Sequence, residues 1–185
     1  NGKTDGEPVI TPENKDGDVT GAHNSVVENT RETVRGTVKV EADAGIKTVT
    51  VGGIDITNAT TTPVEIEATD NGTLTVTRYD ASTGEITYSY TENGTAKDHS
   101  ARKDSVVDSF VVRVTDVAGV SKENNLTIQI IDTKPVAIVD TNTIEEDSVS
   151  VDGNVITGTG KDNLGADAVT VVGVVAGSQT ADVTT

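Results

Sequence analysis

Five carboxylates crowd into one short stretch of this sequence. They are Asp132, Asp140, Glu145, Glu146 and Asp147, and they lie on both sides of a proline. Extended rather than helical sequence separates them, so a turn at Glu145–Asp147 can bring its side chains back toward Asp132. Ca²⁺ takes six to eight oxygen ligands at about 2.3–2.6 Å, many of them carboxylates. The sequence therefore predicts a calcium site at this joint, although a solvated acidic linker would give the same pattern.

Other acidic residues could complete this calcium site. We expect Asp116 and the loop from Asp98 to Asp104 to contribute ligands, because both flank the apolar strand predicted around Phe110. Glu28, near the start of the first predicted module, occupies the position that Glu145 or Glu146 holds in the second. An acidic residue repeated at equivalent places strengthens the interpretation as a metal site.

A second candidate calcium loop combines Asp152-Gly153-Asn154 with the segment from Asp162 to Asp167. The pattern Asp-x-x-Gly-x-Asp in that segment bends a loop so that oxygens at alternating positions face inward. The flanking helices and the bidentate Glu of an EF-hand are missing, and Asp, Asn and Gly are also ordinary turn formers. The loop is either a second ion site or only a turn.

The charge balance excludes some partners. The chain has 30 acidic and 14 basic side chains, a net charge of −16. Nucleic acid needs basic side chains to neutralise its phosphates, so it is not an expected partner. So many carboxylates repel one another in a compact fold unless a cation binds, which favours calcium; simple solubility is the alternative explanation.

The chain offers little for catalysis. His23 and His99 are its two histidines, it has no cysteine, and no His-Glu-x-x-His spacing occurs, which argues against zinc chemistry. Ser100 follows His99, but the Gly-x-Ser-x-Gly elbow of serine hydrolases is absent. We expect no enzymatic activity. The sequence also has neither a signal peptide nor an apolar run of about 18 residues, so we expect a fragment of a longer protein without a membrane span.

Alternating apolar and polar residues predict short β-strands from about Asn24 to Asp132. Their apolar positions are Val38 and Val40, Val49 and Val51, Leu74 and Val76, Ile86, Tyr88 and Tyr90, Phe110, Val112 and Val114, and Leu126, Ile128 and Ile130. Turn residues such as Gly52-Gly53 and Asn93-Gly94 separate them. About seven strands in roughly 110 residues is the size of an immunoglobulin-like or cadherin-like sandwich. We predict such a sandwich over residues 23–134, and a linker or the tail of a preceding module over residues 1–22.

Residues 135–185 are predicted to begin a second β-sandwich without finishing it. Short strands are expected at 136–139, 149–151, 154–157 and 168–175, and the segment has no aromatic residue. About fifty residues are marginal for an independent core. The module is therefore expected to be truncated, or split so that its missing strands come from elsewhere. The predicted fold class is all-β, with tandem immunoglobulin-like or cadherin-like modules of which the second is incomplete.

The four aromatic residues are expected to form the core of the first sandwich. Tyr88 and Tyr90 share the inward phase of Ile86, and Phe110 begins another apolar alternation. Tyr79 is the one ring left free enough for a carbohydrate-binding surface, which needs exposed aromatic rings. The sequence therefore gives a sugar site only weak support.

The stretch from about residue 24 to residue 147 resembles the repeat module of very large bacterial RTX adhesins, which are exported by type I secretion. The resemblance rests on the order of a tyrosine hairpin (Tyr79 to Tyr90), Asp98-His99-Ser100, Asp108-Ser109-Phe110, Val114-Thr115-Asp116 and the Asp-x-x-Pro linker Asp132–Pro135. It implies a calcium-stiffened structural extender on the bacterial cell surface, with a role in adhesion and biofilm formation. The implied partners are neighbouring modules of the same chain, and other domains would bind host or biofilm ligands. The alternative is a sugar- or peptide-binding module at the adhesin tip.

Overall fold

The computed structural model describes residues 6–15, 22–59, 61–97, 106–158, 160–166 and 169–171. The chain divides into two compact units, Asn1–Thr133 and Lys134–Thr185, which are described separately below. The boundary between the units falls between Thr133 and Lys134.

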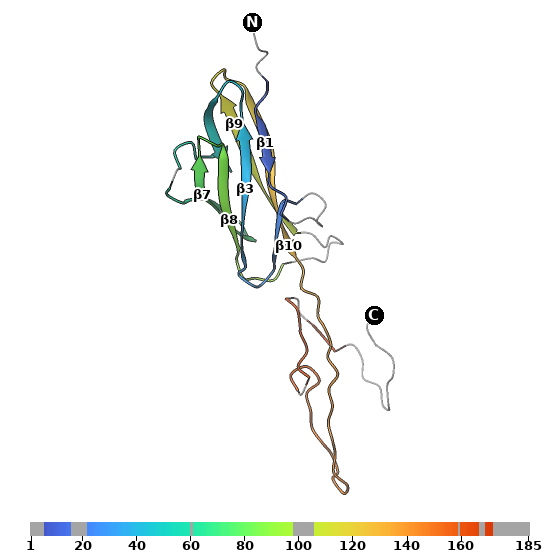
Figure 1. Cartoon of the computed structure of the whole chain (residues 1–185). Coiled ribbons are helices and arrows are strands. Elements are labelled where there is room, and N and C mark those ends of the chain that lie inside the picture. The colour runs from blue at the N-terminus through green and yellow to red at the C-terminus, as the bar shows by residue number, and fades with distance from the viewer. Residues whose placement is uncertain are drawn as a thin grey trace. The chain divides into compact units, whose positions relative to one another are not determined.

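Ten strands make up the described part of the first unit, and Figure 1 shows them running along its length. They are β1 (Val9–Pro12), β2 (Asn24–Val27), β3 (Thr33–Glu41), β4 (Ile46–Val51), β5 (Ile54–Asp55), β6 (Val64–Ala68), β7 (Gly72–Asp80), β8 (Glu85–Glu92), β9 (Val106–Asp116) and β10 (Ser121–Ile131). None of the described residues forms a helix that is long and apolar enough to cross a membrane.

The strands form two five-stranded sheets. The first has the order β1-β3-β8-β7-β6 and the second the order β2-β10-β9-β4-β5. β2 pairs with β10 in parallel, whereas the other neighbours are antiparallel. The strands β1, β3, β8 and β7 stand in the order A, B, E, D of the immunoglobulin fold, and β4, β9 and β10 in the order C, F, G. The prediction of an all-β sandwich is confirmed.

The core lies between the two sheets and consists of the inward residues of each alternation. Every apolar pair or triplet predicted from the period-two pattern is buried there, because β-branched and aromatic side chains fill a pleated surface well. Tyr90 and Phe110 meet across the sheets with ring centroids 6.2 Å apart. Fully burying one such large side chain contributes about 1.5–3 kcal/mol to folding.

The expectation that the four aromatic residues form the core is confirmed, and it includes Tyr79, the one ring that the sequence left free enough for a sugar site. The side chain of Tyr79 is 1% exposed, and the other three aromatic residues are buried as well. A β-bulge lies between Val76 and Arg78 in the pairing of β7 with β8, and it shifts the phase by one residue. Tyr79 therefore faces the core, although it lies an odd number of residues after the buried Leu74 and a regular strand would place it on the opposite face. No aromatic side chain of the chain remains for a carbohydrate-binding surface.

The short strands at the sheet edges were not predicted. Residues 1–22 were expected to be a linker, yet β1 lies within that range, pairs with β3 and places Ile10 in the core. β1 is short and ends on Pro12, so its apolar alternation is too brief to be distinguished from a loop. β2, β5 and β6 also lack the longer period-two pattern of the central strands.

Glycine is required at the hairpin between β7 and β8. Gly84 has a φ of +72°, and a Cβ atom placed on it would lie 2.1 Å from the carbonyl oxygen of Val40. Gly53, in the turn between β4 and β5, has a φ of +80° with no atom within 4 Å of such a Cβ. The first position needs glycine for both conformation and space, and the second for conformation alone.

The chain enters and leaves the first unit at opposite ends. β1 begins beside the last residue of β3, with Val9 opposite Glu41, and Glu7 Oε2 lies 2.7 Å from Nζ of Lys122 near the start of β10. β10 then runs the length of the sheet to Ile131 (Figure 1). We call the end with the Val117–Val120 turn the upstream end, and the end with Ile131–Thr133 the downstream end.

The second unit has little regular structure among its residues described between 134 and 171. Its β-pairing there is one isolated bridge between Val136 and Asn163. The predicted strands 136–139, 149–151 and 154–157 do not form as strands, because no sheet of the described residues pairs with them. Most of their apolar side chains are exposed, and Val149 is fully exposed. The predicted strand 168–175 lies largely outside the described residues. That this unit is an incomplete sandwich stays a prediction.

Candidate functional site

Glu28, a predicted calcium ligand, is fully buried at the downstream end of the first unit. Its Oε2 accepts a hydrogen bond of 2.7 Å from the backbone amide of Lys97. Its Oε1 accepts hydrogen bonds from the backbone amide and hydroxyl of Thr133, at 3.1 and 3.3 Å. The carboxylate therefore ties the end of β2 to the segment by which the chain leaves the unit, and both of its oxygens already have donors.

Glu92, which the sequence did not single out, is the second buried carboxylate at this end. Its Oε2 accepts hydrogen bonds from the amides of Thr30, Arg31 and Gly94, at 3.1, 2.9 and 2.8 Å. Asn29 and Arg31 have φ values of 57° and 58°, which turn several amides toward one point, as in an anion-binding nest. Burial opposes ionisation of Glu92, but these backbone hydrogen bonds outweigh it and lower its pKa.

Lys97 is also buried at the downstream end. Its Nζ donates hydrogen bonds to Asn93 Oδ1, Thr95 Oγ1 and the carbonyl oxygen of Asp70, at 2.5, 2.6 and 3.2 Å. Glu92 Oε1 lies 3.5 Å from the same nitrogen, and the two side chains are 6% and 0% exposed. Such a pair is strongly destabilising to break, because the remaining charge stays buried.

Asp108 joins the two sheets near the downstream end. Its Oδ2 accepts hydrogen bonds of 2.5 Å from both Thr69 Oγ1 and Tyr90 Oη, and its Oδ1 accepts one of 2.6 Å from Asn71 Nδ2. Burial and the neighbouring carboxylate raise the pKa of Tyr90. The network is a fully satisfied polar contact between β9 and the opposite sheet, and it leaves no oxygen atom of Asp108 without a donor.

Asp116 lies at the other, upstream end, where β9 turns into β10. Its side chain is fully buried, and Oδ1 accepts a hydrogen bond of 2.8 Å from the amide of Val120. Within the described part of the chain, Oδ2 is buried without a hydrogen-bond partner. An unsatisfied buried carboxylate oxygen is costly unless a cation or water completes it. Asp116 is therefore a predicted ligand of the first unit with a buried carboxylate oxygen that a cation could satisfy.

The structure does not bring Asp116 and Asp132 together. Ile130 of β10 is paired with Val106 at the start of β9, so Asp132, two residues further along the chain, lies at the downstream end. Asp116 is the last residue of β9 and lies at the upstream end. About ten steps of roughly 3.3 Å separate the two ends of β9. The expectation that Asp116 completes an ion shell around Asp132 is therefore wrong for these two residues, since one strand length lies between them.

The predicted ligands of the second unit are spread over several turns. Asp162 Oδ1 accepts a hydrogen bond of 2.7 Å from the amide of Ile138, and Asp140 Oδ1 is a buried atom without a described hydrogen-bond partner. Glu145, Glu146 and Asp147 are exposed in a turn, and Asp152 is exposed as well. Asn154 Oδ1 accepts hydrogen bonds from the amides two and three residues ahead, so it closes an ordinary turn.

The described residues contain no group of three or more His, Cys, Asp or Glu side chains placed to hold a metal ion. Asp98, Asp104 and Asp167, which complete the predicted ligand set, lie outside the described residues. The proposed ion shells are therefore not assembled from the side chains described.

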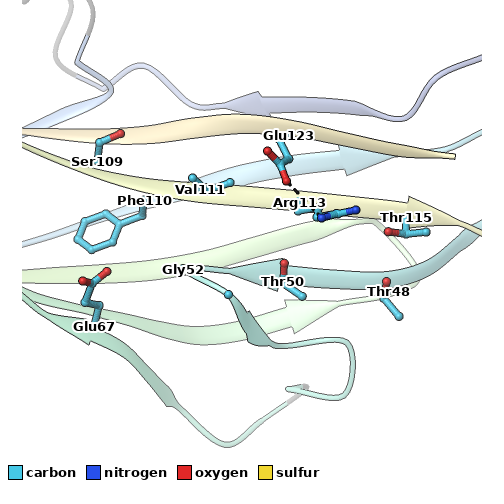
Figure 2. Close-up of a pocket in the computed structure, with 11 residues that line it drawn as sticks. Thr48, Thr50, Gly52, Glu67, Ser109, Phe110, Val111, Arg113, Thr115 and Glu123 are labelled. Atoms are coloured by element: carbon cyan, nitrogen blue, oxygen red, sulfur yellow. Dashed lines mark ion pairs between the residues drawn. The ribbon is translucent and has the colours of Figure 1, made fainter.

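An open groove of about 660 Å³ lies on the outer face of the second sheet (Figure 2). Its lining includes the hydroxyls of Thr48, Thr50 and Thr115 and the ion pair of Arg113 with Glu123, whose charged atoms are 3.4 Å apart. Both partners of this pair are about half exposed, so it contributes little. The groove offers no buried polar side chain that would orient a sugar or a peptide.

The buried charges that the sequence analysis missed follow a simple rule. Glu92 continues the inward phase of Tyr88 and Tyr90, and Asp108 precedes Phe110 at the same spacing of two. Extending each apolar alternation by one step at either end would have identified both carboxylates as inward-facing. Lys97 lies in a loop and has no such signal.

Comparison of the chain with protein-family models, with curated proteins and with solved structures finds no match in any of the three.

Proposed function

We propose that this chain is a structural extender of a secreted bacterial surface adhesin, in which β-sandwich modules follow one another and calcium stiffens the joints between them. The observation that carries the proposal is the path of the chain through the first unit. The chain enters at the upstream end and leaves at the downstream end, so each module adds its full length to a series. The proposal assigns the chain no catalytic step.

The burial of every aromatic ring supports a spacer over a sugar-binding module. Sugar sites need exposed rings, and the four aromatic side chains lie in the core. The resemblance to adhesin repeats, which rests on the motif order from Tyr79 to Pro135, supports the location on the bacterial surface and the role in adhesion and biofilm formation.

Calcium fits some of the predicted ligands and not others. Asp116 fits, since a cation would supply the partner that Oδ2 lacks among the described atoms. Glu28 does not fit, because its two oxygens accept hydrogen bonds from Lys97 and Thr133. When bound, calcium would contribute positive charge among carboxylates that otherwise repel, in a chain with a net charge of −16.

The first prediction is that calcium raises the melting temperature of the protein and that EDTA lowers it. A site held at about 100 times its dissociation constant adds roughly 2.7 kcal/mol to the stability of the folded state. Asp116→Asn should reduce this increment, whereas the exposed control Glu65→Gln should retain it. Equal melting temperatures of the unmodified protein in millimolar calcium and in chelator would remove calcium from the proposal.

A further inference from the structure

Four oxygen atoms surround the ammonium group of Lys97 inside the downstream end. They belong to Asn93, Thr95, Asp70 and Glu92, at 2.5, 2.6, 3.2 and 3.5 Å from Nζ. The three N–H groups of the ammonium can each donate a hydrogen bond to one of the three nearest oxygens, and the negative charge of the Glu92 carboxylate balances the positive charge of the lysine. This set of four oxygens is called the ammonium cradle below.

The cradle is held in place by contacts that do not involve the lysine. The Glu92 carboxylate is fixed by the amides of Thr30, Arg31 and Gly94. The amide of Asn93 donates to the carbonyl oxygen of Asn71 at 3.0 Å, and Asn93 Nδ2 donates to the carbonyl oxygen of Asp70. The oxygens are therefore arranged by two turns, one after β6 and one after β8, before the cation is considered.

We propose that the ammonium cradle is a binding site for a primary ammonium ion, which the chain itself occupies with Lys97. The lysine acts as an internal cation, so the buried charge of Glu92 is balanced without a metal ion. The inference does not depend on the proposed function, because it concerns contacts within one unit.

An ammonium ion suits the cradle better than calcium does. Calcium takes six to eight oxygens at about 2.3–2.6 Å and favours several carboxylates. The cradle has four described oxygens at unequal distances, and Glu92 is the carboxylate that meets Nζ among the described residues. N–H donors can interact with the oxygens of Asp70 and Glu92 at 3.2 and 3.5 Å, whereas these distances are too long for a calcium–oxygen bond.

The cradle also controls how the chain leaves the unit. The backbone amide of Lys97 donates to Glu28, and Glu28 accepts from Thr133. When the ammonium group of Lys97 is fixed, the backbone amide of Lys97 is fixed as well, and this amide positions the Glu28 carboxylate. Glu28 in turn positions Thr133, the last residue of the first unit. Loss of the cation should loosen Thr133 as well as the turn around Asn93.

The test is chemical rescue of Lys97→Ala in the whole chain. Alanine removes three methylene groups and the ammonium, which n-propylammonium restores. The variant should melt roughly 10 °C or more below the unmodified protein, because a buried charge has lost its partner. Added n-propylammonium should raise its melting temperature in a saturating manner, and tetramethylammonium, which has no N–H donor, should not. The control Lys122→Ala removes an exposed lysine and should show no response to either ion.

Two results would overturn the proposal. One is an unchanged melting temperature of Lys97→Ala, and the other is rescue by calcium but not by n-propylammonium, which would make the cradle a metal site. If the variant does not fold, nuclear magnetic resonance of the unmodified protein decides. The Nζ protons of Lys97 should exchange with water much more slowly than those of Lys122, and equally fast exchange would contradict an occupied cradle.

Discussion

The buried acidic side chains among the described residues of the first sandwich lie at or near the end of a strand. Glu28 follows β2, Glu92 ends β8, Asp108 lies near the start of β9, and Asp116 ends it. Backbone amides within a strand are committed to the ladder, whereas those of the adjoining turns are free to point inward. Glu28, Glu92 and Asp116 can therefore be buried with amide donors at the ends of the sandwich, where they organise the turns. Asp108 instead takes its donors from side chains.

His23, one of the chain's two histidines, has a structural role at this scale. Its Nδ1 lies 3.1 Å from the backbone amide of Thr127 and 2.8 Å from Thr127 Oγ1. A backbone amide can only donate, so Nδ1 must carry no proton there. Burial also lowers the pKa of His23. Both facts favour the neutral ring in the folded state.

The second prediction follows from the direction of this pKa shift. The unfolded chain takes up a proton near pH 6.5 and the folded chain only at a lower pH, so the unfolded state binds more protons in between. The His23 contribution to stability is complete above about pH 6.5 and is lost as the pH falls through the folded pKa. His23→Asn keeps an acceptor near the Nδ1 position and does not titrate. Its melting temperature should fall less between about pH 7.5 and 5.5 than that of the unmodified protein, and equal slopes would contradict this role.

Among the elements, the long central strands could be predicted from sequence and the short edge strands could not. Three alternating apolar residues, as in Phe110, Val112 and Val114, define a buried face without further information. A four-residue strand such as β1 carries too few alternations, and its place is decided by its pairing with β3. The bulge that buries Tyr79 is likewise set by the register of β7 against β8, which one strand's sequence does not contain.

The candidate site was predictable to a similar degree. The sequence identified Glu28 and Asp116 as acidic residues of interest, and both are fully buried. It could not show that a whole strand length separates Asp116 from Asp132, because that depends on the direction of β9 relative to the chain exit. It also missed Lys97, whose partners come from two different turns.

The third prediction compares two glycines with left-handed conformations. Gly84→Ala should destabilise the protein by roughly 2–3 kcal/mol, because a strained backbone and a clash with the carbonyl of Val40 add together. Gly53→Ala has the same kind of strain without a clash and should cost only about 1 kcal/mol. Denaturant unfolding of both variants measures the difference. Equal losses would mean that the β7–β8 hairpin yields to the extra methyl group.

At the scale of the whole molecule, the two units differ in how much apolar surface they bury. The first has twenty buried apolar residues in one cluster, all of them from that unit. In the second, apolar side chains from Val136 to Val155 are exposed among the described residues. The alternation of valines there predicted strands, but a strand needs a neighbour and a covered face before it is stable.

The fourth prediction is that residues 134–185 do not fold as a separate monomer, whereas residues 1–133 do. Ordering costs roughly 1.5 kcal/mol per residue, which the few apolar groups of the second unit cannot offset. The shorter piece should show neither a cooperative melt nor dispersed amide resonances, and residues 1–133 serve as the positive control. A cooperative melt of the monomeric 134–185 piece would contradict the prediction of an incomplete sandwich.

The parallel pairing of β2 with β10 determines how the first unit would respond to tension. Pulling on the two ends of the chain draws β2 toward the upstream end and β10 toward the downstream end, so the hydrogen bonds between them are sheared together. Pulling on Val106 and Ile130, at the open end of the antiparallel β9–β10 pair, would instead break bonds one after another. Cysteine handles are unambiguous because the chain has no cysteine of its own. In single-molecule stretching, the end-to-end geometry should therefore rupture at the higher force, so that the first unit is most resistant along the line that joins its two chain ends.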